Sequence, residues 1–234
     1  MRYLSRVKSL VGKFAIVTGG SSGIGAACAQ ALAAEGAAVL ACSRRFAAAA
    51  AHPAPGLVAT AHLDVTDEAE VRARFAELPQ LDILVCAAGT GTFKAIVDTS
   101  VTEMREMLDV HITGTFLCAR EALRRMQPRR TGHLVLIGSH AAHHGFPECG
   151  GYTAAKAGQL GLGRVLAAEA RPHDIRVTTL MPGATDTPIW DDRPGFDRSK
   201  MMKPEDVASF LVSIVSRPQI SVEEVVITPP AGVL

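Results

Sequence analysis

The chain has few cysteines, few aromatic residues and no excess of charge of either sign. Its five cysteines are scattered and form no CxxC pair, which argues against a disulfide framework or a zinc site of clustered thiolates. With 24 basic and 23 acidic residues the net charge is +1, and this balance excludes a strongly basic nucleic-acid-binding surface. No apolar run approaches the roughly 20 residues that span a bilayer. We therefore expect a soluble, cytoplasmic protein with reduced thiols, no membrane segment and no nucleic-acid partner.

Short β-branched runs alternate with longer amphipathic ones along the 234 residues. This alternation predicts an α/β fold: one doubly wound, parallel sheet of seven strands with helices on both faces, in a single domain over residues 1–234. The expected strands are 14–18, 38–42, 57–62, 83–86, 133–137, 175–180 and 225–228, and the expected helices are 24–34, 67–78, 101–126, 152–170 and 204–215.

Three segments fall outside this alternation. Residues 1–6 are basic and lack the apolar stretch of a secretory signal, so we interpret them as a lead-in to the first strand. Residues 45–56 begin with alanines and continue with prolines, which predicts a shortened helix and a loop. Residues 187–203 contain Pro188, Pro194 and Gly195 without a clear period, which predicts a mobile loop over the substrate.

A glycine-rich turn joins the first expected strand to the first expected helix. Such a turn lets the backbone approach a pyrophosphate, which then lies at the helix N-terminus, although any tight strand-to-helix turn can use glycine. The turn reads Thr18-Gly19-Gly20-Ser21-Ser22-Gly23-Ile24-Gly25.

Two further motifs support a cofactor-binding role for this turn. Tyr152-x-x-x-Lys156 lies downstream, and Ser139 precedes the tyrosine by thirteen residues. With these motifs the chain resembles the classical short-chain dehydrogenases/reductases from about Lys13 to Pro230. The resemblance implies a Rossmann-type fold, a bound dinucleotide, and hydride transfer between a nicotinamide and a carbonyl or secondary alcohol carbon.

The chemistry of the Ser-Tyr-Lys set can be argued from the residues. Tyr152 and Lys156 are four apart on one helix and share a face, which in an isolated pair would indicate only a solvated surface contact. A lysine cation about 4 Å from a phenol favours the phenolate by about 4 kcal/mol at an effective dielectric near 20. We therefore expect Lys156 to lower the pKa of Tyr152 so that the tyrosine can move a proton, while Ser139 holds the substrate oxygen.

The end of the second strand indicates which cofactor is bound. Enzymes of this fold that use NAD place an acid there, about 20 residues after the glycines, whereas this chain reads Cys42-Ser43-Arg44-Arg45. Ser43 and Arg44 suit a 2′-phosphate, although a solvated charge pair is the alternative, so we predict NADP(H), with NAD(H) less favoured. Taken with the resemblance, the expected cofactor-binding residues are Thr18, Gly19, Ser21, Ser22, Gly23, Ile24, Gly25, Ser43, Arg44, Arg45, Asp64, Val65, Ala87, Ala88, Gly89, Tyr152, Lys156, Pro182, Gly183, Thr185 and Thr187.

The chain departs from the family pattern at two places. Cys86-Ala87-Ala88-Gly89 replaces the usual Asn-Asn-Ala-Gly, so side-chain hydrogen bonds are lost there. His111 stands where the family has a fourth catalytic residue, an asparagine that anchors a water leading to the lysine. Histidine at this position could keep the proton relay, alter its pH dependence, or merely fill a helix kink.

A histidine cluster lies between Ser139 and Tyr152. His140, His143 and His144 have no nearby carboxylate pair, so we expect no metal site and interpret them as part of the pocket wall. The other pocket candidates rest on position alone; they are Phe93, Phe146, Glu148, Cys149 and Trp190.

We therefore predict an NADP(H)-dependent oxidoreductase acting on a small carbonyl compound or alcohol, with Ser139, Tyr152, Lys156 and His111 as catalytic residues. A non-catalytic NADP-binding regulator is the alternative, and a lyase or epimerase of the extended branch is disfavoured by chain length and glycine spacing. The expected helix 152–170 is small or apolar nearly all round, so we expect two buried faces and a homotetramer or homodimer.

Overall fold

The structure of the protein is a computed structural model that describes residues 8–47, 53–191, 193 and 195–232. One parallel sheet has the strand order β3-β2-β1-β4-β5-β6-β7, which confirms the predicted fold class. Because the chain crosses from β3 at one edge to β4 beside β1, the order reverses between β1 and β4. The strands are β1 (Phe14–Thr18), β2 (Ala38–Cys42), β3 (Val58–Ala61), β4 (Ile83–Cys86), β5 (Gly132–Ile137), β6 (Ile175–Pro182) and β7 (Glu224–Ile227).

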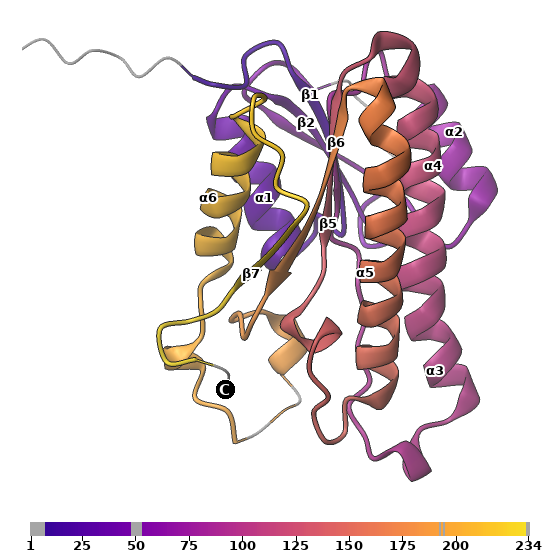
Figure 1. The fold of residues 1–234 in the computed structure, drawn as a ribbon, viewed down its shortest axis with the longest axis vertical. Coiled ribbons are helices and arrows are strands. Elements are labelled where there is room, and N and C mark those ends of the chain that lie inside the picture. Colours follow the sequence, from indigo (N-terminus) through magenta and orange to yellow (C-terminus); the bar gives the residue numbers. More distant parts are fainter. Residues whose placement is uncertain (1–7, 48–52, 192, 194, 233–234) are drawn as a thin grey trace, which may run out of the picture.

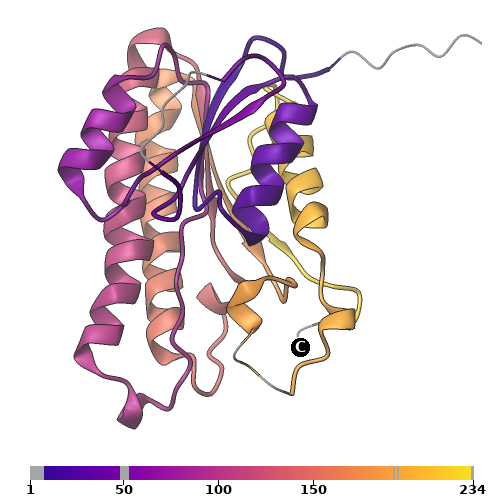
Figure 2. The same ribbon diagram turned by 180° about the vertical axis from the view of Figure 1, so that it is seen from behind.

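Helices cover both faces of the sheet. Figure 1 shows α1 (Gly23–Ala34) and α6 (Pro204–Val215) together on one face. The other face carries α2 (Glu68–Ala76), α4 (Gly114–Met126) and α5 (Gly150–Ala170), and Figure 2 shows the same two layers from behind. Helix α3 (Val101–Leu108) precedes α4 and packs on α5.

The strand residues alternate between two hydrophobic cores. On β1, Phe14 and Ile16 belong to the core beneath α2, α4 and α5, whereas Ala15 and Val17 belong to the core beneath α1 and α6. All of β1 is buried, as expected for a strand covered on both faces. The sheet is therefore packed on both faces, between two helical layers.

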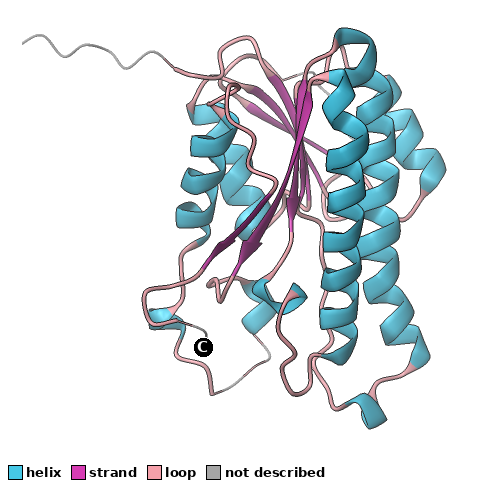
Figure 3. Cartoon of the chain, viewed as in Figure 1, coloured by secondary structure: helices cyan, strands magenta, loops and turns pink. Residues whose placement is uncertain are grey.

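The carboxyl ends of all the strands lie along one edge of the sheet, because the strands are parallel. Figure 3 shows the loops that follow β5 and β6 gathered below this edge, together with the short 3₁₀ helices η4 (His140–Ala142) and η6 (Pro188–Trp190). In open α/β sheets, ligands bind at this edge beside the point where the strand order reverses. The topology thus fixes where a site is expected.

Most element boundaries agree with the expected ones, and β1, β2, β4 and α6 have the predicted bounds. The helix expected over 101–126 is different, because a π-helical turn over Asp109–Thr113 separates α3 from α4. Single π turns inside helices are frequent at functional sites. This one carries His111.

The irregular segments have mixed outcomes. Residues 1–6 lie outside the described part of the chain, as do 48–52, and the described remainder of 45–56 contains no helix. Residues 187–203 include η6 and a second 3₁₀ turn, η7 (Arg198–Lys200), which the sequence pattern did not predict. Within the described ranges, no helix combines the length and apolar character needed to cross a membrane.

Candidate functional site

A cavity of about 1100 Å³ opens at the carboxyl edge of the sheet. It is lined by the glycine turn, the ends of β2, β4, β5 and β6, and the start of α5. The predicted site residues line it, except for Thr18, His143 and His144. Thr18 is 1% exposed, and its hydroxyl donates to the Val85 carbonyl oxygen at 3.4 Å.

The glycine turn is shaped by contacts that leave no room for side chains. A Cβ atom at Gly19 would lie 2.6 Å from the Ala87 and Ala88 backbone, and one at Gly25 would lie 2.3 Å from the Gly19 carbonyl oxygen. Gly19 also has a positive φ of 70°. The first turn of α1 thus presents bare backbone to the cavity, which is the geometry that a pyrophosphate requires.

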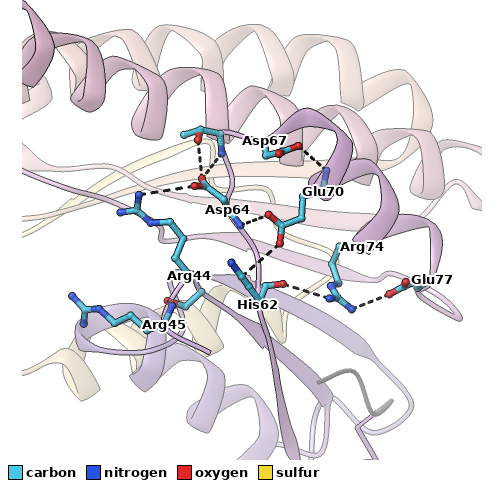
Figure 4. Close-up of polar contacts among 10 residues, drawn as sticks. Arg44, Arg45, His62, Asp64, Asp67, Glu70, Arg74 and Glu77 are labelled. Carbon is cyan, nitrogen blue, oxygen red and sulfur yellow. Dashed lines mark hydrogen bonds and ion pairs between the residues drawn. The ribbon is translucent and has the colours of Figure 1, made fainter. Parts of the chain in front are cut away.

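Serine and arginine side chains gather beside this turn, at the end of β2. The hydroxyls of Ser21 and Ser43 are 2.9 Å apart, and Arg45 Nη1 donates to Ser22 Oγ at 3.4 Å. Arg44 Nη1 lies 4.0 Å from Asp64 Oδ2, a loose ion pair that leaves the guanidinium more than half exposed. Figure 4 shows Arg44 directed toward Asp64 and Arg45 directed away from it. The residues present fit a phosphorylated ribose, since hydroxyls and guanidinium groups are suited to an anion.

Asp64 is held in place by its neighbours. Its Oδ1 accepts hydrogen bonds from the Thr66 backbone N–H at 2.9 Å and the Thr66 hydroxyl at 2.8 Å, and its own N–H donates to Glu70. Partial burial acts to raise the pKa of Asp64, but the Thr66 hydrogen bonds and the Arg44 cation outweigh it and lower the pKa below its usual value. Asp64 is therefore a fixed carboxylate beside the expected adenine position.

Ser139 and Tyr152 both line the cavity and contact each other. Ser139 follows β5 and caps η4, where its Oγ accepts from the Ala141 N–H at 3.1 Å. Tyr152 lies in the first turn of α5. Burial raises the pKa of Tyr152 to about 12, although its hydrogen bond with Ser139 acts to lower it. The expectation that Lys156 lowers this pKa is wrong for the protein alone, because Lys156 Nζ lies 5.7 Å from the centre of the tyrosine ring and desolvation dominates.

Lys156 is 4% exposed and has two acceptors. Its Nζ donates to the Ile137 carbonyl oxygen at 2.8 Å and to Gln159 Oε1 at 3.2 Å. Burial lowers the pKa of Lys156 to about 7. The sequence analysis missed Gln159, and the available signal was an amide at a core-facing position of an otherwise small and apolar helix.

His111 is buried in the π turn, and its Nε2 lies 2.7 Å from the Thr90 carbonyl oxygen. Its Nδ1 has no hydrogen-bond partner in the described part of the chain. Burial and the nearby Lys156 cation lower the pKa of His111 to about 3. A Cβ at Gly89 would meet the imidazole at 2.9 Å, so Gly89 provides the space that this ring fills.

The histidine cluster lies only partly in the cavity wall. His140 lines the cavity and stacks on His144 with ring centres 4.2 Å apart. His143 and His144 are exposed and do not line the cavity, so their interpretation as pocket-wall residues is wrong. Among the described residues, no group of three or more His, Cys, Asp or Glu side chains could hold a metal ion.

Part of the cavity wall is aromatic. Phe93 packs on Tyr152 with ring centres 5.4 Å apart, and Trp190 packs on Phe196 at 4.8 Å. The Arg193 guanidinium lies against Phe93, Trp190 and Phe196. Neither Arg193 nor Phe196 was predicted as a site residue, because the irregular sequence of this loop carries no periodic pattern.

Comparisons with known proteins agree with this geometry. The family model for short chain dehydrogenases matches residues 13–195. The chain belongs to the short-chain dehydrogenase/reductase family. A cis-4-hydroxycyclohexanecarboxylate dehydrogenase from Sinomonas cyclohexanicum is 35% identical over 87% of this chain and 89% of its own. A glycine betaine reductase from Emericella nidulans is also 35% identical over 94% of this chain, which spans only 19% of that longer protein.

The solved structures include one with a bound cofactor analogue. An alcohol dehydrogenase from the archaeon Thermococcus sibiricus, complexed with 5-hydroxy-NADP, superposes with a TM-score of 0.80 at 26% identity. The match covers 92% of this chain and 95% of the other. The family, the fold and the cavity together show an oxidoreductase of alcohol and carbonyl groups that binds a nicotinamide cofactor.

Proposed function

We propose that the protein is an NADP(H)-dependent oxidoreductase that interconverts a small carbonyl compound and its alcohol through Ser139, Tyr152 and Lys156. The observation that carries the proposal is that these three side chains line the same cavity as the glycine turn. A non-catalytic NADP-binding regulator would not need a buried phenol, a hydroxyl and an ammonium group around one space. Residues 187–203 serve as the substrate loop.

Bound NADP(H) would supply the hydride in reduction and accept it in oxidation. In reduction, Ser139 orients the carbonyl oxygen by a hydrogen bond, and Tyr152 donates its proton to that oxygen as the carbon becomes an alcohol. The phenolate left on Tyr152 then lies near the Lys156 cation, which favours it electrostatically. Oxidation reverses these steps.

Preference for NADP(H) over NAD(H) is supported by the end of β2. Strand β2 ends at Cys42 and is followed by Ser43, Arg44 and Arg45, so no carboxylate stands where it would repel a 2′-phosphate. The Thermococcus alcohol dehydrogenase structure also contains an NADP derivative. The substrate class has support as well, since the named substrate of the Sinomonas relative carries a secondary alcohol and a carboxylate.

The experiment is to replace Tyr152 with phenylalanine, which removes one hydroxyl and keeps the ring. NADPH oxidation with a panel of aldehydes and ketones should fall by a factor of about 10² to 10⁴, because the proton donor is lost. NADPH binding, followed by nucleotide fluorescence, should remain. Ser139→Ala should likewise lower turnover and retain NADPH binding. Near-normal turnover by Tyr152→Phe would contradict the proposal.

A further inference from the structure

An arginine lies in the wall of the cavity, held by three aromatic rings. The guanidinium carbon of Arg193 is 4.0 Å from the centre of Phe93, 4.9 Å from Phe196 and 5.0 Å from Trp190. All four residues line the cavity. Stacking of this kind fixes a guanidinium group at little cost to its hydrogen bonding, because the N–H donors point outward in the plane of the group.

This cation lies close to the reacting centre. The Phe93 ring contacts Arg193 and also packs on Tyr152 with ring centres 5.4 Å apart at an angle of 53°. A single aromatic ring therefore separates the guanidinium group from the proposed proton donor. A substrate whose oxygen is held by Tyr152 would extend past Phe93 to reach Arg193.

The charge of Arg193 has no ion-pair partner within the described ranges. Asp64 and Glu148 are the carboxylates that line the cavity; Asp64 is paired with Arg44, and neither forms an ion pair with Arg193. Arg198 on the same loop provides the contrast, since it binds both Asp186 and Asp191 and does not line the cavity. The planar fork of a guanidinium group matches a carboxylate and binds it through two parallel hydrogen bonds.

The geometry points to a substrate that carries a carboxylate, bound by Arg193 and separated from the reacting carbonyl by several bonds. This inference rests on the proposed function and specifies the substrate class of that site. A carboxylate bonded directly to the reacting carbon is disfavoured, because Phe93 stands between the two binding groups. Selectivity comes from the guanidinium group, which has no ion-pair partner among the residues that the structure describes.

The test compares 5-oxohexanoate with 5-oxohexanamide, which differ in charge and hardly in shape. The wild-type protein with NADPH should reduce the acid with a kcat/KM roughly tenfold to a hundredfold higher, as expected for a charge-assisted pair. Arg193→Gln should abolish this ratio by lowering only the value for the acid, and Arg193→Lys should keep part of it. Arg198→Gln, which removes a cation from the same loop, should leave the ratio unchanged.

A binding measurement separates this inference from the proposed function. Hexanoate should bind the NADPH-saturated protein more tightly than hexanamide by calorimetry, and Arg193→Gln should remove the difference. If no carbonyl compound is reduced but hexanoate still binds through Arg193, the proposed function fails, and Arg193 remains a carboxylate-binding site without the proposed reaction.

Three results would overturn the inference. The first is an equal kcat/KM of the wild-type protein for the acid and the amide. The second is a loss of kcat/KM in Arg193→Gln that is equal for both compounds. The third is a higher kcat/KM for trimethyl(5-oxohexyl)ammonium than for the acid. The second would make Arg193 a packing residue of the loop. The third would show that the aromatic rings accept a cation from the substrate in place of Arg193.

Discussion

The amide oxygen of Gln159 lies 3.2 Å from Nζ of Lys156, one turn away on the same helix. The amide is oriented, because its Nε2 donates to Thr115 Oγ1 at 2.9 Å and the residue is fully buried. Gln159 and the Ile137 carbonyl oxygen thus hold the ammonium group from two sides. His111, by contrast, bonds the Thr90 backbone. We infer that Gln159 positions the lysine, a contact that the sequence analysis did not expect.

Replacing Gln159 with leucine should lower the pKa of Lys156, because the variant lacks the amide oxygen that stabilises the charged ammonium group in the wild-type protein. A hydrogen bond to a charged group contributes about 1.5–3 kcal/mol, which corresponds to roughly one to two pH units. The alkaline limb of the kcat/KM profile that reports Lys156 should move to lower pH by that amount. His111 and Cys86 also face this lysine and stay unchanged in the variant.

Two further variants make the test specific to Gln159. Gln159→Glu places a carboxylate at the same position and should move the limb to higher pH. Thr115→Val removes only the anchor of the amide and should give a smaller shift than Gln159→Leu. If the alkaline limb of the kcat/KM profile stays at the same pH in both Gln159 variants, then Gln159 has only a packing role.

Cofactor choice should depend on Arg44. A charge-assisted hydrogen bond to the 2′-phosphate predicts a preference for NADPH over NADH of roughly tenfold or more. Arg44→Asp should reverse it, since a carboxylate would then repel the phosphate beside Asp64. Arg74→Gln is the matched control, because Arg74 pairs with Glu77 (Figure 4) and does not line the cavity. Binding titrations with both nucleotides measure the ratio, and equal affinities in the wild-type protein would contradict the assignment.

The framework of the fold and the cofactor end of the cavity could be predicted because they depend on local patterns. Buried strands such as β1 and β4 are continuous apolar runs between turns. The backbone contacts at Gly19 and Gly25 demand glycine, so the motif is visible in the sequence.

The rest depends on packing between segments distant in the sequence. The π turn at His111 arises from the fit of that ring beside Gly89, which no periodicity encodes. The raised pKa of Tyr152 reflects burial, which outweighs the hydrogen bond with Ser139. Arg193 was missed because its role depends on three rings from two separate segments.

Acid should destabilise the protein through its buried histidines. His133 is 2% exposed and its Nε2 lies 2.8 Å from Thr178 Oγ1. Burial lowers the pKa of His133 to about 3 from 6.5. Between those values the unfolded chain binds a proton that the folded chain does not, so the free energy of unfolding decreases as the pH falls from about 6.5 toward 3. The slope is about 1.4 kcal/mol per pH unit for one such histidine.

Urea unfolding at pH 7.5, 6 and 5 measures this slope. His133→Gln keeps a donor for Thr178 and cannot titrate. The free energy of unfolding of this variant should therefore depend less steeply on pH, and the difference in slope should correspond to about one bound proton. His143→Gln removes an exposed histidine and should leave the slope unchanged. Parallel pH dependences for the wild type and His133→Gln would show that His133 is protonated equally in both states.

Assembly is the last expectation, and the structure makes it more specific. Helix α5 is buried on one side only; the other side exposes Ala154, Ala157, Gly161 and Val165, with Val165 53% exposed. Nothing lies within 4 Å of a Cβ built at Gly161, although glycine inside a helix costs about 1 kcal/mol relative to alanine. A flat stripe of small residues permits close approach of a second α5 across a two-fold axis.

We therefore expect light scattering to report a mass of two or four chains, with four favoured because Phe116 extends the apolar surface onto α4. Ala157→Arg places a long cation in the centre of the stripe and should shift the protein toward single chains at micromolar concentration. Ala73→Arg is the matched control, since Ala73 is an exposed alanine on α2, away from this surface. A wild-type protein that stays monomeric and stable at that concentration would show that no second copy covers this side of α5.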